Sequence, residues 1–345
     1  MKKKTSPLFS KYIIDGQAMD ETPFSALYDS LDGIGTVHTP DEEFEDIVDE
    51  TPDHSCATLE LSEAKLPEYI RLIESAPYNE KKADLSYPAT WTEKSINAVL
   101  LDLLFREGRF CLQDILLMPT WTWNQAPTGN ASAFWESTAA AGRYLFDLGV
   151  RLDRYFVEES RKDCTLEWAV RSKISPRRRC PAKADTPLSD SHILYIPFTS
   201  GRYFLGGSAL SAVLGGGGKD PDPTDADYFL DCYEVVREMV EDGVVKAGIP
   251  VGRGGLALAA EKFCRGKMAE PDIRGIIAAT GETDKFRILF SEVPGVLMQI
   301  ADEDLDYVDS QLLLQEVAYY EIAPGRTPGG DNGISFILSS LLRNS

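Results

Sequence analysis

The sequence has few of the residues from which metal sites and disulfide frameworks are built. Its 345 residues include six cysteines and three histidines, all scattered, and no C-x-x-C pair. Because a structural zinc site draws on closely spaced ligands of these two types, the spacing argues against one. We therefore expect reduced thiols and a cytoplasmic protein.

Basic residues and long apolar runs are also scarce. There are 35 Lys and Arg against 55 Asp and Glu, which gives a net charge of −20. Such a surface repels phosphate backbones, so a nucleic-acid partner is not expected. No segment approaches the 18 consecutive apolar residues of a spanning helix, so a membrane partner is not expected. No apolar run follows the lysines at the start, so a signal peptide is not expected either.

The remaining composition is that of an ordinary globular protein, with 43% hydrophobic and 26% charged residues. A chain of this length is expected to form two domains and to stabilise itself without disulfides. The distribution of charged and apolar residues along the chain predicts an irregular acidic N-terminal extension over residues 1–80, a first domain over 81–190 and a second over 191–345. Residues 41–53 carry eight acids and no bases, which favours a solvated loop.

Hydrophobic periodicity predicts a mixture of helices and strands in both domains. Residues 91–107 and 131–148 have helical spacing and enclose an apolar strand at 112–118. Further on, a helix over 227–242 precedes a short strand over 244–249, and helices and strands continue to alternate. We expect an α+β first domain with an open mixed sheet and an α/β second domain.

Two glycine pairs stand where helices are predicted to begin. Gly206 and Gly207 precede Ser208, and Gly254 and Gly255 open a second helix. Glycine lets a ligand approach the backbone closely, and unpaired N–H groups at a helix start attract anions. These five residues are therefore candidates for nucleotide or phosphate binding. The alternative is that the glycines only allow a helix to pack tightly against a strand.

Other signals of catalysis are weak. The sequence has no G-x-S-x-G elbow and no Walker loop. Glu292 follows an apolar segment and is a candidate ligand for magnesium on a bound nucleotide. It is equally well interpreted as a surface acid.

Several segments resemble one enzyme family. Residues 202–210 (RYFLGGSAL) resemble the R-L-G-G-S/T-A-L-A run of phosphoribosylformylglycinamidine synthase, and residues 289–295 (LFSEVPG) resemble its L-F-S-E-x-x-G. Upstream, residues 121–123 with Gly129 resemble N-W-M-W…P-G-E, and residues 146–150 resemble the end of its D-L-G-I/V helix. The order of these segments matches the second aminoimidazole-ribonucleotide-synthetase-like half of that enzyme.

The resemblance implies a fold, a reaction and an assembly. Members of the family make an amidine from an amide during purine synthesis, using ATP, magnesium and ammonia. Their fold is the two-domain architecture of aminoimidazole ribonucleotide synthetase, in which two units pair through the sheets of their first domains. A chain with one such unit is therefore expected to form a homodimer through that sheet.

The charged positions of the family's motifs depart from the pattern. Counting from Gly149, the lysine and aspartate of the family's G-K-D-S fall on Phe156 and Val157, and its H-D pair falls on Ile249 and Pro250. None of these four side chains can hold magnesium or orient a phosphate. We therefore expect no catalytic residue, and a degenerate relative that at most binds ATP or phosphate weakly. The alternatives are an active ATP-dependent ligase or a piece of one, and a structural or regulatory interaction module.

Overall fold

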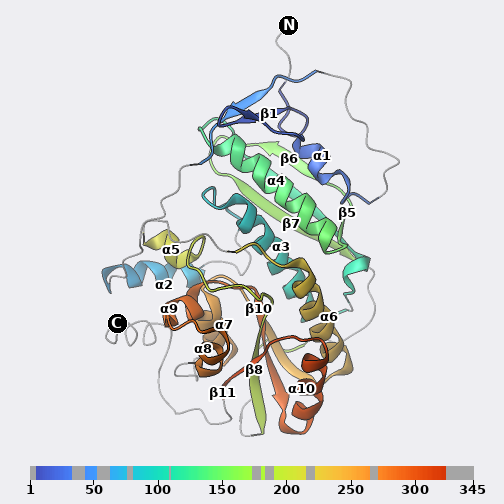
Figure 1. The fold of residues 1–345 in the computed structure, drawn as a ribbon, viewed down its shortest axis with the longest axis vertical. Helices are drawn as coiled ribbons and strands as arrows, with labels where there is room; N and C mark the ends of the chain where they lie inside the picture. Colours follow the sequence, from blue (N-terminus) through green and yellow to red (C-terminus); the bar gives the residue numbers. More distant parts are fainter. Residues whose placement is uncertain are drawn as a thin grey trace. The chain divides into compact units, whose positions relative to one another are not determined.

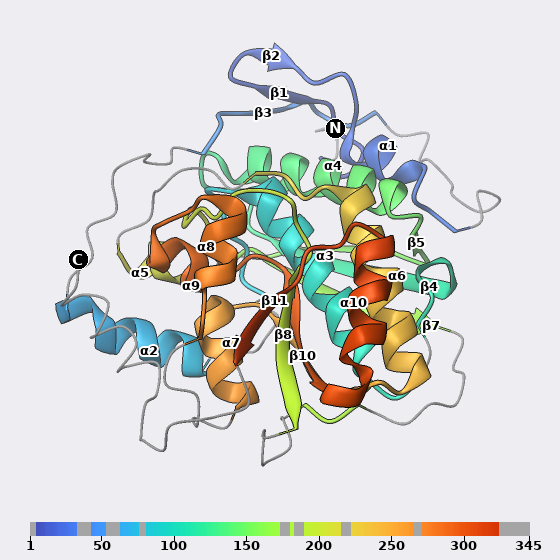
Figure 2. The same ribbon diagram turned by 60° about the horizontal axis from the view of Figure 1, so that its bottom comes forward.

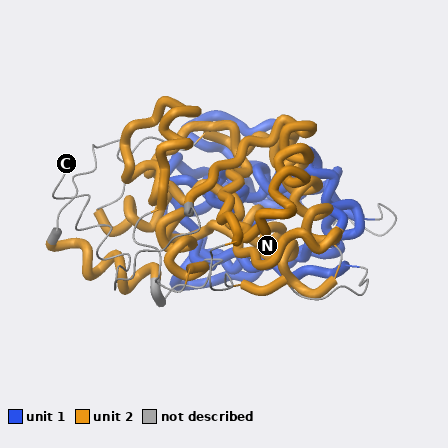
Figure 3. Tube along the Cα trace, turned by 90° about the horizontal axis from the view of Figure 1, so that it is seen from below, with its two compact units in different colours: residues 1–54, 81–96, 111–173 blue, residues 55–80, 97–110, 174–345 orange. Residues whose placement is uncertain are grey.

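In the computed structural model, the chain forms two compact units, each with its own sheet (Figure 3). Unit 1 comprises residues 1–54, 81–96 and 111–173, and unit 2 comprises 55–80, 97–110 and 174–345. Helix α3 (Pro88–Leu104) begins in unit 1 and ends in unit 2. The predicted two-domain α+β fold is confirmed. The structure describes residues 5–32, 43–52, 63–75, 81–108, 110–172, 180–182, 190–214, 222–264 and 271–323.

The main sheet of unit 1 is mixed, as predicted, and is built around the nine-residue strand β4 (Ile115–Trp123). Strands β5 (Arg151–Leu152) and β6 (Phe156–Glu159) pair with β4 in parallel, and β7 (Thr165–Ser172) pairs with it antiparallel. Burial alternates strictly along β4, because successive side chains of a strand point to opposite faces. One face of this sheet is therefore core, and the other is half-exposed.

Helix α4 (Asn130–Asp147) packs against the buried face of β4 through aromatic side chains. The rings of Trp121 and Trp123 lie 6.3 and 5.7 Å from that of Phe134, both edge to face. Each indole N–H has a partner, since Trp121 donates to the Ser137 hydroxyl and Trp123 to the carbonyl of Asn130. The tryptophans of the family-like loop are therefore core anchors, which satisfy their polar atoms inside the unit.

The predicted irregular extension contains regular structure. Strands β1 (Tyr12–Ile14), β2 (Gln17–Ala18) and β3 (Ile47–Asp49) form a small sheet in the order β2-β1-β3, and helix α1 (Pro23–Tyr28) packs on α4. Strand β3 lies inside the acidic stretch predicted as a loop, because Ile47 and Val48 pair with β1. Residues 41, 42 and 53 of that stretch lie outside the described residues.

Unit 2 is built on a four-stranded sheet in the order β11-β8-β10-β9, with every pair antiparallel. The predicted alternation of helices and strands is present, but it does not produce the parallel sheet of an α/β unit. These strands are β8 (Ser191–Pro197), β9 (Val245–Val251), β10 (Gly295–Ala301) and β11 (Tyr320–Ala323).

Helices cover both faces of the unit 2 sheet. Figure 2 shows α7, α8 and α9 on one side of the strands, and α6 and α10 on the other. All seven residues of β10 are consequently buried. The helices are α2 (Leu66–Ser75), α5 (Ala209–Val213), α6 (Ala226–Asp242), α7 (Gly255–Phe263), α8 (Arg274–Thr280), α9 (Lys285–Phe290) and α10 (Leu305–Leu314), with 3-10 turns at Glu63–Lys65, Leu112–Asp114 and Asp302–Asp304.

Within the described part of the chain, no helix combines the length and apolar character needed to cross a membrane. The ribbon in Figure 1 shows these elements in the colours of the sequence and labels most of them.

The contact between α1 and α4 requires a glycine at position 142. A Cβ atom there would clash with the carbonyl oxygen of Ala26 and lie 2.7 Å from its carbonyl carbon. We expect Gly142→Ala to lower the free energy of unfolding by about 1–3 kcal/mol, because backbone atoms must move to make room. Gly275→Ala in α8 is the matched control, since its Cβ would meet only the Tyr320 ring at 3.5 Å. Urea unfolding midpoints measure both, and an unchanged midpoint for Gly142→Ala would contradict this packing.

Candidate functional site

Ser208 forms the predicted helix start. Its hydroxyl accepts the N–H of Ser211 at 3.1 Å and donates to the carbonyl of Leu205 at 2.6 Å, so it caps α5. Gly207, just before it, has a positive φ of 67°. Gly206 completes the turn that leads into this five-residue helix.

Gly254 and Gly255 open α7 in left-handed conformations, with φ of 84° and 66°. A Cβ at position 255 would clash with the carbonyl oxygen of Leu289 and lie 2.9 Å from the Cα of Phe290. Glycine at 255 is therefore required for the close approach of α7 to the end of α9. This observation favours the packing interpretation of the glycine pair.

Glu292 brings the two predicted helix starts together. Its Oε1 accepts the backbone N–H of Ala209 at 3.0 Å, in the first turn of α5, and the N–H of Gly254 at 2.9 Å, at the start of α7. The residue is half-buried and holds a positive φ of 59°, which is uncommon for a side chain other than glycine. A carboxylate of the chain itself therefore lies on N–H donors that were predicted to face a ligand anion.

The predicted role of Glu292 as a magnesium ligand stays a prediction. The Oε1 of Glu292 already accepts hydrogen bonds from two backbone N–H groups, whose partial positive charges face it. Among the described residues, no group of three or more histidine, cysteine, aspartate and glutamate side chains gathers in a way that could hold a metal ion. What the structure does show is that Oε1 of Glu292 accepts hydrogen bonds from two backbone amides.

Asp49 plays the same part in unit 1, and sequence reasoning missed it. Its Oδ1 accepts the N–H of Gly129 at 2.8 Å, and its Oδ2 accepts those of Ala131 and Ser132 at 2.8 and 2.9 Å. These donors lie at the start of α4, where the helix dipole favours a negative charge. No local pattern connects residues 80 positions apart, so only the folded chain reveals this cap.

A buried tyrosine lies next to the Glu292 segment. The ring of Tyr69, on α2, packs edge to face on Phe290 with centroids 5.9 Å apart. Burial raises the pKa of Tyr69 well above its usual value; the charge of Glu292 raises it further, and Arg253 opposes the shift. Tyr69 therefore stays protonated at neutral pH and adds no charge here.

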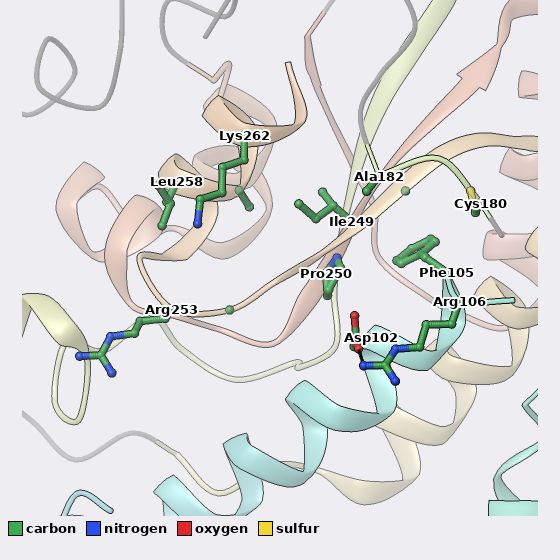
Figure 4. Close-up of a pocket in the computed structure, with 13 residues that line it drawn as sticks. Asp102, Phe105, Arg106, Cys180, Ala182, Ile249, Pro250, Arg253, Leu258 and Lys262 are labelled. Carbon is green, nitrogen blue, oxygen red and sulfur yellow. Dashed lines mark ion pairs between the residues drawn. The ribbon is translucent and has the colours of Figure 1, made fainter. Parts of the chain in front are cut away.

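A cavity of about 230 Å³ opens in unit 2, beside the stretch where the family's H-D pair is expected (Figure 4). Its apolar wall is formed by Phe105, Ile249, Pro250 and Leu258. Residues at the end of α3, the short segment 180–182, strand β9 and helix α7 all contribute. Sequence reasoning could not assemble these segments, although it singled out Ile249 and Pro250.

Three basic side chains and one acid line this cavity. Arg106 forms an ion pair with Asp102 one turn earlier in α3. Figure 4 shows this pair on one side of Pro250, with Lys262 and Arg253 on the other. Lys262 is exposed and makes no ion pair within the described ranges, whereas Arg253 is half-buried. In a chain of net charge −20, the cavity is a local site of positive charge.

None of the predicted site residues is among the described residues that line this cavity. Gly254 follows Arg253 directly, and neither the two glycine pairs nor Glu292 is part of the wall. Phe156, at the predicted lysine position, is 47% exposed on β6 of unit 1. Whether Gly206, Gly207, Ser208, Gly254 and Gly255 contact a ligand stays a prediction.

Comparison with known proteins supports the resemblance seen in the motifs. No protein-family model matches the sequence. A probable phosphoribosylformylglycinamidine synthase of Arabidopsis thaliana, chloroplastic or mitochondrial, is 28% identical over 247 residues, 65% of this chain and 17% of that protein. The human phosphoribosylformylglycinamidine synthase is 24% identical over 211 residues, 57% of this chain and 15% of that protein. The chain therefore spans less than a fifth of either relative.

Solved structures give a similar picture at lower identity. Thermotoga maritima PurL complexed with ATP is 14% identical, with a TM-score of 0.47, and the match covers 75% of this chain and 44% of that one. The PurLQS structure from the same organism reaches a TM-score of 0.48, also at 14% identity, and the match covers 75% of this chain and 44% of that one. From the sequence relatives, the chain is related to phosphoribosylformylglycinamidine synthase, as the motifs predicted.

The two hydrogen bonds that Glu292 accepts from Ala209 and Gly254, here called the Glu292 bridge, should contribute measurably to stability. We expect Glu292→Ala to lower the free energy of unfolding by about 2–4 kcal/mol, because two backbone N–H groups lose a charged acceptor. Glu292→Gln should cost less, since its amide oxygen can still accept. Glu316→Ala is the control, because Glu316 has a similar φ of 54° but an exposed side chain. Equal losses for Glu292→Ala and Glu316→Ala in chemical unfolding would show that the bridge is not stabilising.

Proposed function

We propose that this relative of phosphoribosylformylglycinamidine synthase does not catalyse the family's reaction and binds a phosphate-bearing ligand weakly in unit 2. The observation that carries the proposal is the cavity beside Ile249 and Pro250. Ile249 and Pro250, which line this cavity, occupy the sequence positions of the family's H-D motif. Positive side chains remain around it.

The lining of the cavity lacks the groups that the family's chemistry needs. Phosphoryl transfer depends on positioned cations and on metal ions that neutralise the charge developing on the phosphate. No histidine lines the cavity, and its one carboxylate, Asp102, is paired with Arg106. The described residues of the lining therefore support the binding of an anion more readily than proton or phosphoryl transfer.

Weak binding follows from the exposed position of Lys262. A solvent-exposed ammonium gains little from an ion pair, because water screens both charges. We therefore infer an affinity in the millimolar range, equivalent to about −4 kcal/mol. ATP without magnesium is one candidate ligand, because the phosphates supply the negative charge.

An active ligase is the second candidate, and one observation favours it. The chain matches only 17% and 15% of the length of the two relatives described above. Catalytic groups missing here could therefore be supplied by another chain. In that case activity would appear only when the complementary chain is added.

The exposed face of the unit 1 sheet supports a homodimer. Thr120 pairs with Phe156 on one side and with Glu167 on the other, and Met118 pairs with Ala169. Directly paired residues share a face, so Met118, Phe156 and Ala169 lie together on the half-exposed side. The same face carries Thr120 and Glu167, so it is mixed, and its apolar part would be stabilised if a second copy covered it.

The first test of the proposal is catalytic. With formylglycinamide ribonucleotide, ammonia and magnesium-ATP, we expect the chain alone to show no substrate-dependent ATP hydrolysis. Removing a single electrostatic group typically costs about 10²–10³ in rate, and several such positions are replaced. Turnover on the order of 1–100 per second would contradict the proposal.

The second test is the mass in solution. We expect light scattering to give twice the mass of the chain, and Phe156→Glu to shift the protein to monomer. Phe146→Glu is the matched control, because Phe146 is 61% exposed but lies on α4 and not on the sheet. A wild-type monomer at micromolar concentrations would contradict the dimer, and so would an equal effect of the two substitutions.

A further inference from the structure

We propose that the unit 2 cavity selects a small organic phosphate with an apolar body, and that Asp102 limits its affinity for that anion. The inference rests on the proposed function, because it specifies which phosphate compound the cavity takes. It combines the size of the cavity, its apolar wall and the distribution of its charges.

The size of the cavity limits how much of a ligand it can enclose. Its volume of about 230 Å³ lies below the roughly 300–1,000 Å³ of pockets that enclose drug-sized molecules. A nucleoside triphosphate has a base, a ribose and three phosphates, so most of it would remain outside. A single phosphate on a small ring or short chain fits.

The apolar wall is held in place by the backbone. Gly248 leaves room for the ring of Phe105, because a Cβ there would lie only 2.7 Å from the Cζ of that ring. The N–H of Cys180 donates to the carbonyl of Phe105 at 3.1 Å, and the N–H of Gly248 donates to that of Pro181 at 2.8 Å. The wall is therefore already formed and offers an apolar surface for the body of a ligand.

The basic side chains that line the cavity differ in how freely they can contact a phosphate. Lys262 makes no ion pair in the described part of the chain, and it is the side chain best placed to contact a phosphate. Arg106 shares its charge with Asp102 in the same wall. A phosphate entering the cavity therefore competes with the carboxylate of Asp102 for Arg106. Removing the negative charge of Asp102 should strengthen anion binding.

The experiment compares three phosphate compounds by calorimetric titration of the full chain. Inorganic phosphate probes the charge alone, phenyl phosphate adds an apolar ring, and ATP without magnesium adds size and charge. We expect phenyl phosphate to bind several-fold more tightly than inorganic phosphate. ATP should bind no more tightly than phenyl phosphate, although it carries more negative charge.

Substitutions in and beside the cavity test whether the phosphate compound binds there. Lys262→Ala should weaken phenyl phosphate binding about twofold to fivefold, equivalent to losing one charged contact at an exposed position. Asp102→Asn should strengthen it about twofold to fivefold. Lys246→Ala is the matched control, since Lys246 is exposed on β9 but does not line the cavity. All three positions are at least partly exposed, and circular dichroism checks that each variant folds.

The outcomes separate this inference from the proposed function. Tighter binding of ATP than of phenyl phosphate, or equal effects of Lys262→Ala and Lys246→Ala, overturns the inference and leaves a phosphate-binding relative. No binding of any of the three compounds at tens of millimolar overturns the binding part of the proposed function itself. Weaker binding in Asp102→Asn overturns the role given to Asp102.

Discussion

Carboxylates from distant segments hold the starts of helices in both units. The first N–H groups of a helix have no partner within it, and the helix dipole places positive charge at the same end. Glu292 meets this requirement for α5 and α7 together, and Asp49 meets it for α4. In unit 2 this single side chain joins two helix starts that lie 45 residues apart in the chain, Ala209 and Gly254.

The glycines of the family-like motifs have a packing role that does not depend on the family's reaction. Gly255 is needed because α7 approaches the backbone at Leu289 and Phe290 more closely than any side chain allows. That constraint concerns packing and operates whether or not a ligand is present. The charged positions carry no such constraint, and they have become Phe156, Val157, Ile249 and Pro250. The packing of these glycines therefore supports the fold whether or not the chain has the family's chemistry, and the small basic cavity belongs to the proposed function.

Local patterns predicted the helices well, because their signals lie within a few turns. The spacing over 227–242 and the glycine after it correspond closely to α6, which ends with Gly243 in the left-handed conformation. Pairing between strands was not predictable in the same way. The alternation of helices and strands suggested an α/β unit, but β8, β9 and β10 pair antiparallel. The role of Asp49 and the cavity between α3, β9 and α7 depend on contacts across long separations in sequence, which periodicity cannot show.

The central claim is that the carboxylate of Glu292 occupies the amide donors that a ligand anion would otherwise use. Hydrogen–deuterium exchange at Ala209 and Gly254 tests it most directly, in the wild type and in Glu292→Ala, with and without phosphate. We expect both amides to be protected in the wild type regardless of phosphate. In Glu292→Ala they should exchange faster, and phosphate should restore part of the protection. Slower exchange of these amides in the wild type on adding phosphate, or unchanged exchange in Glu292→Ala, would contradict the claim.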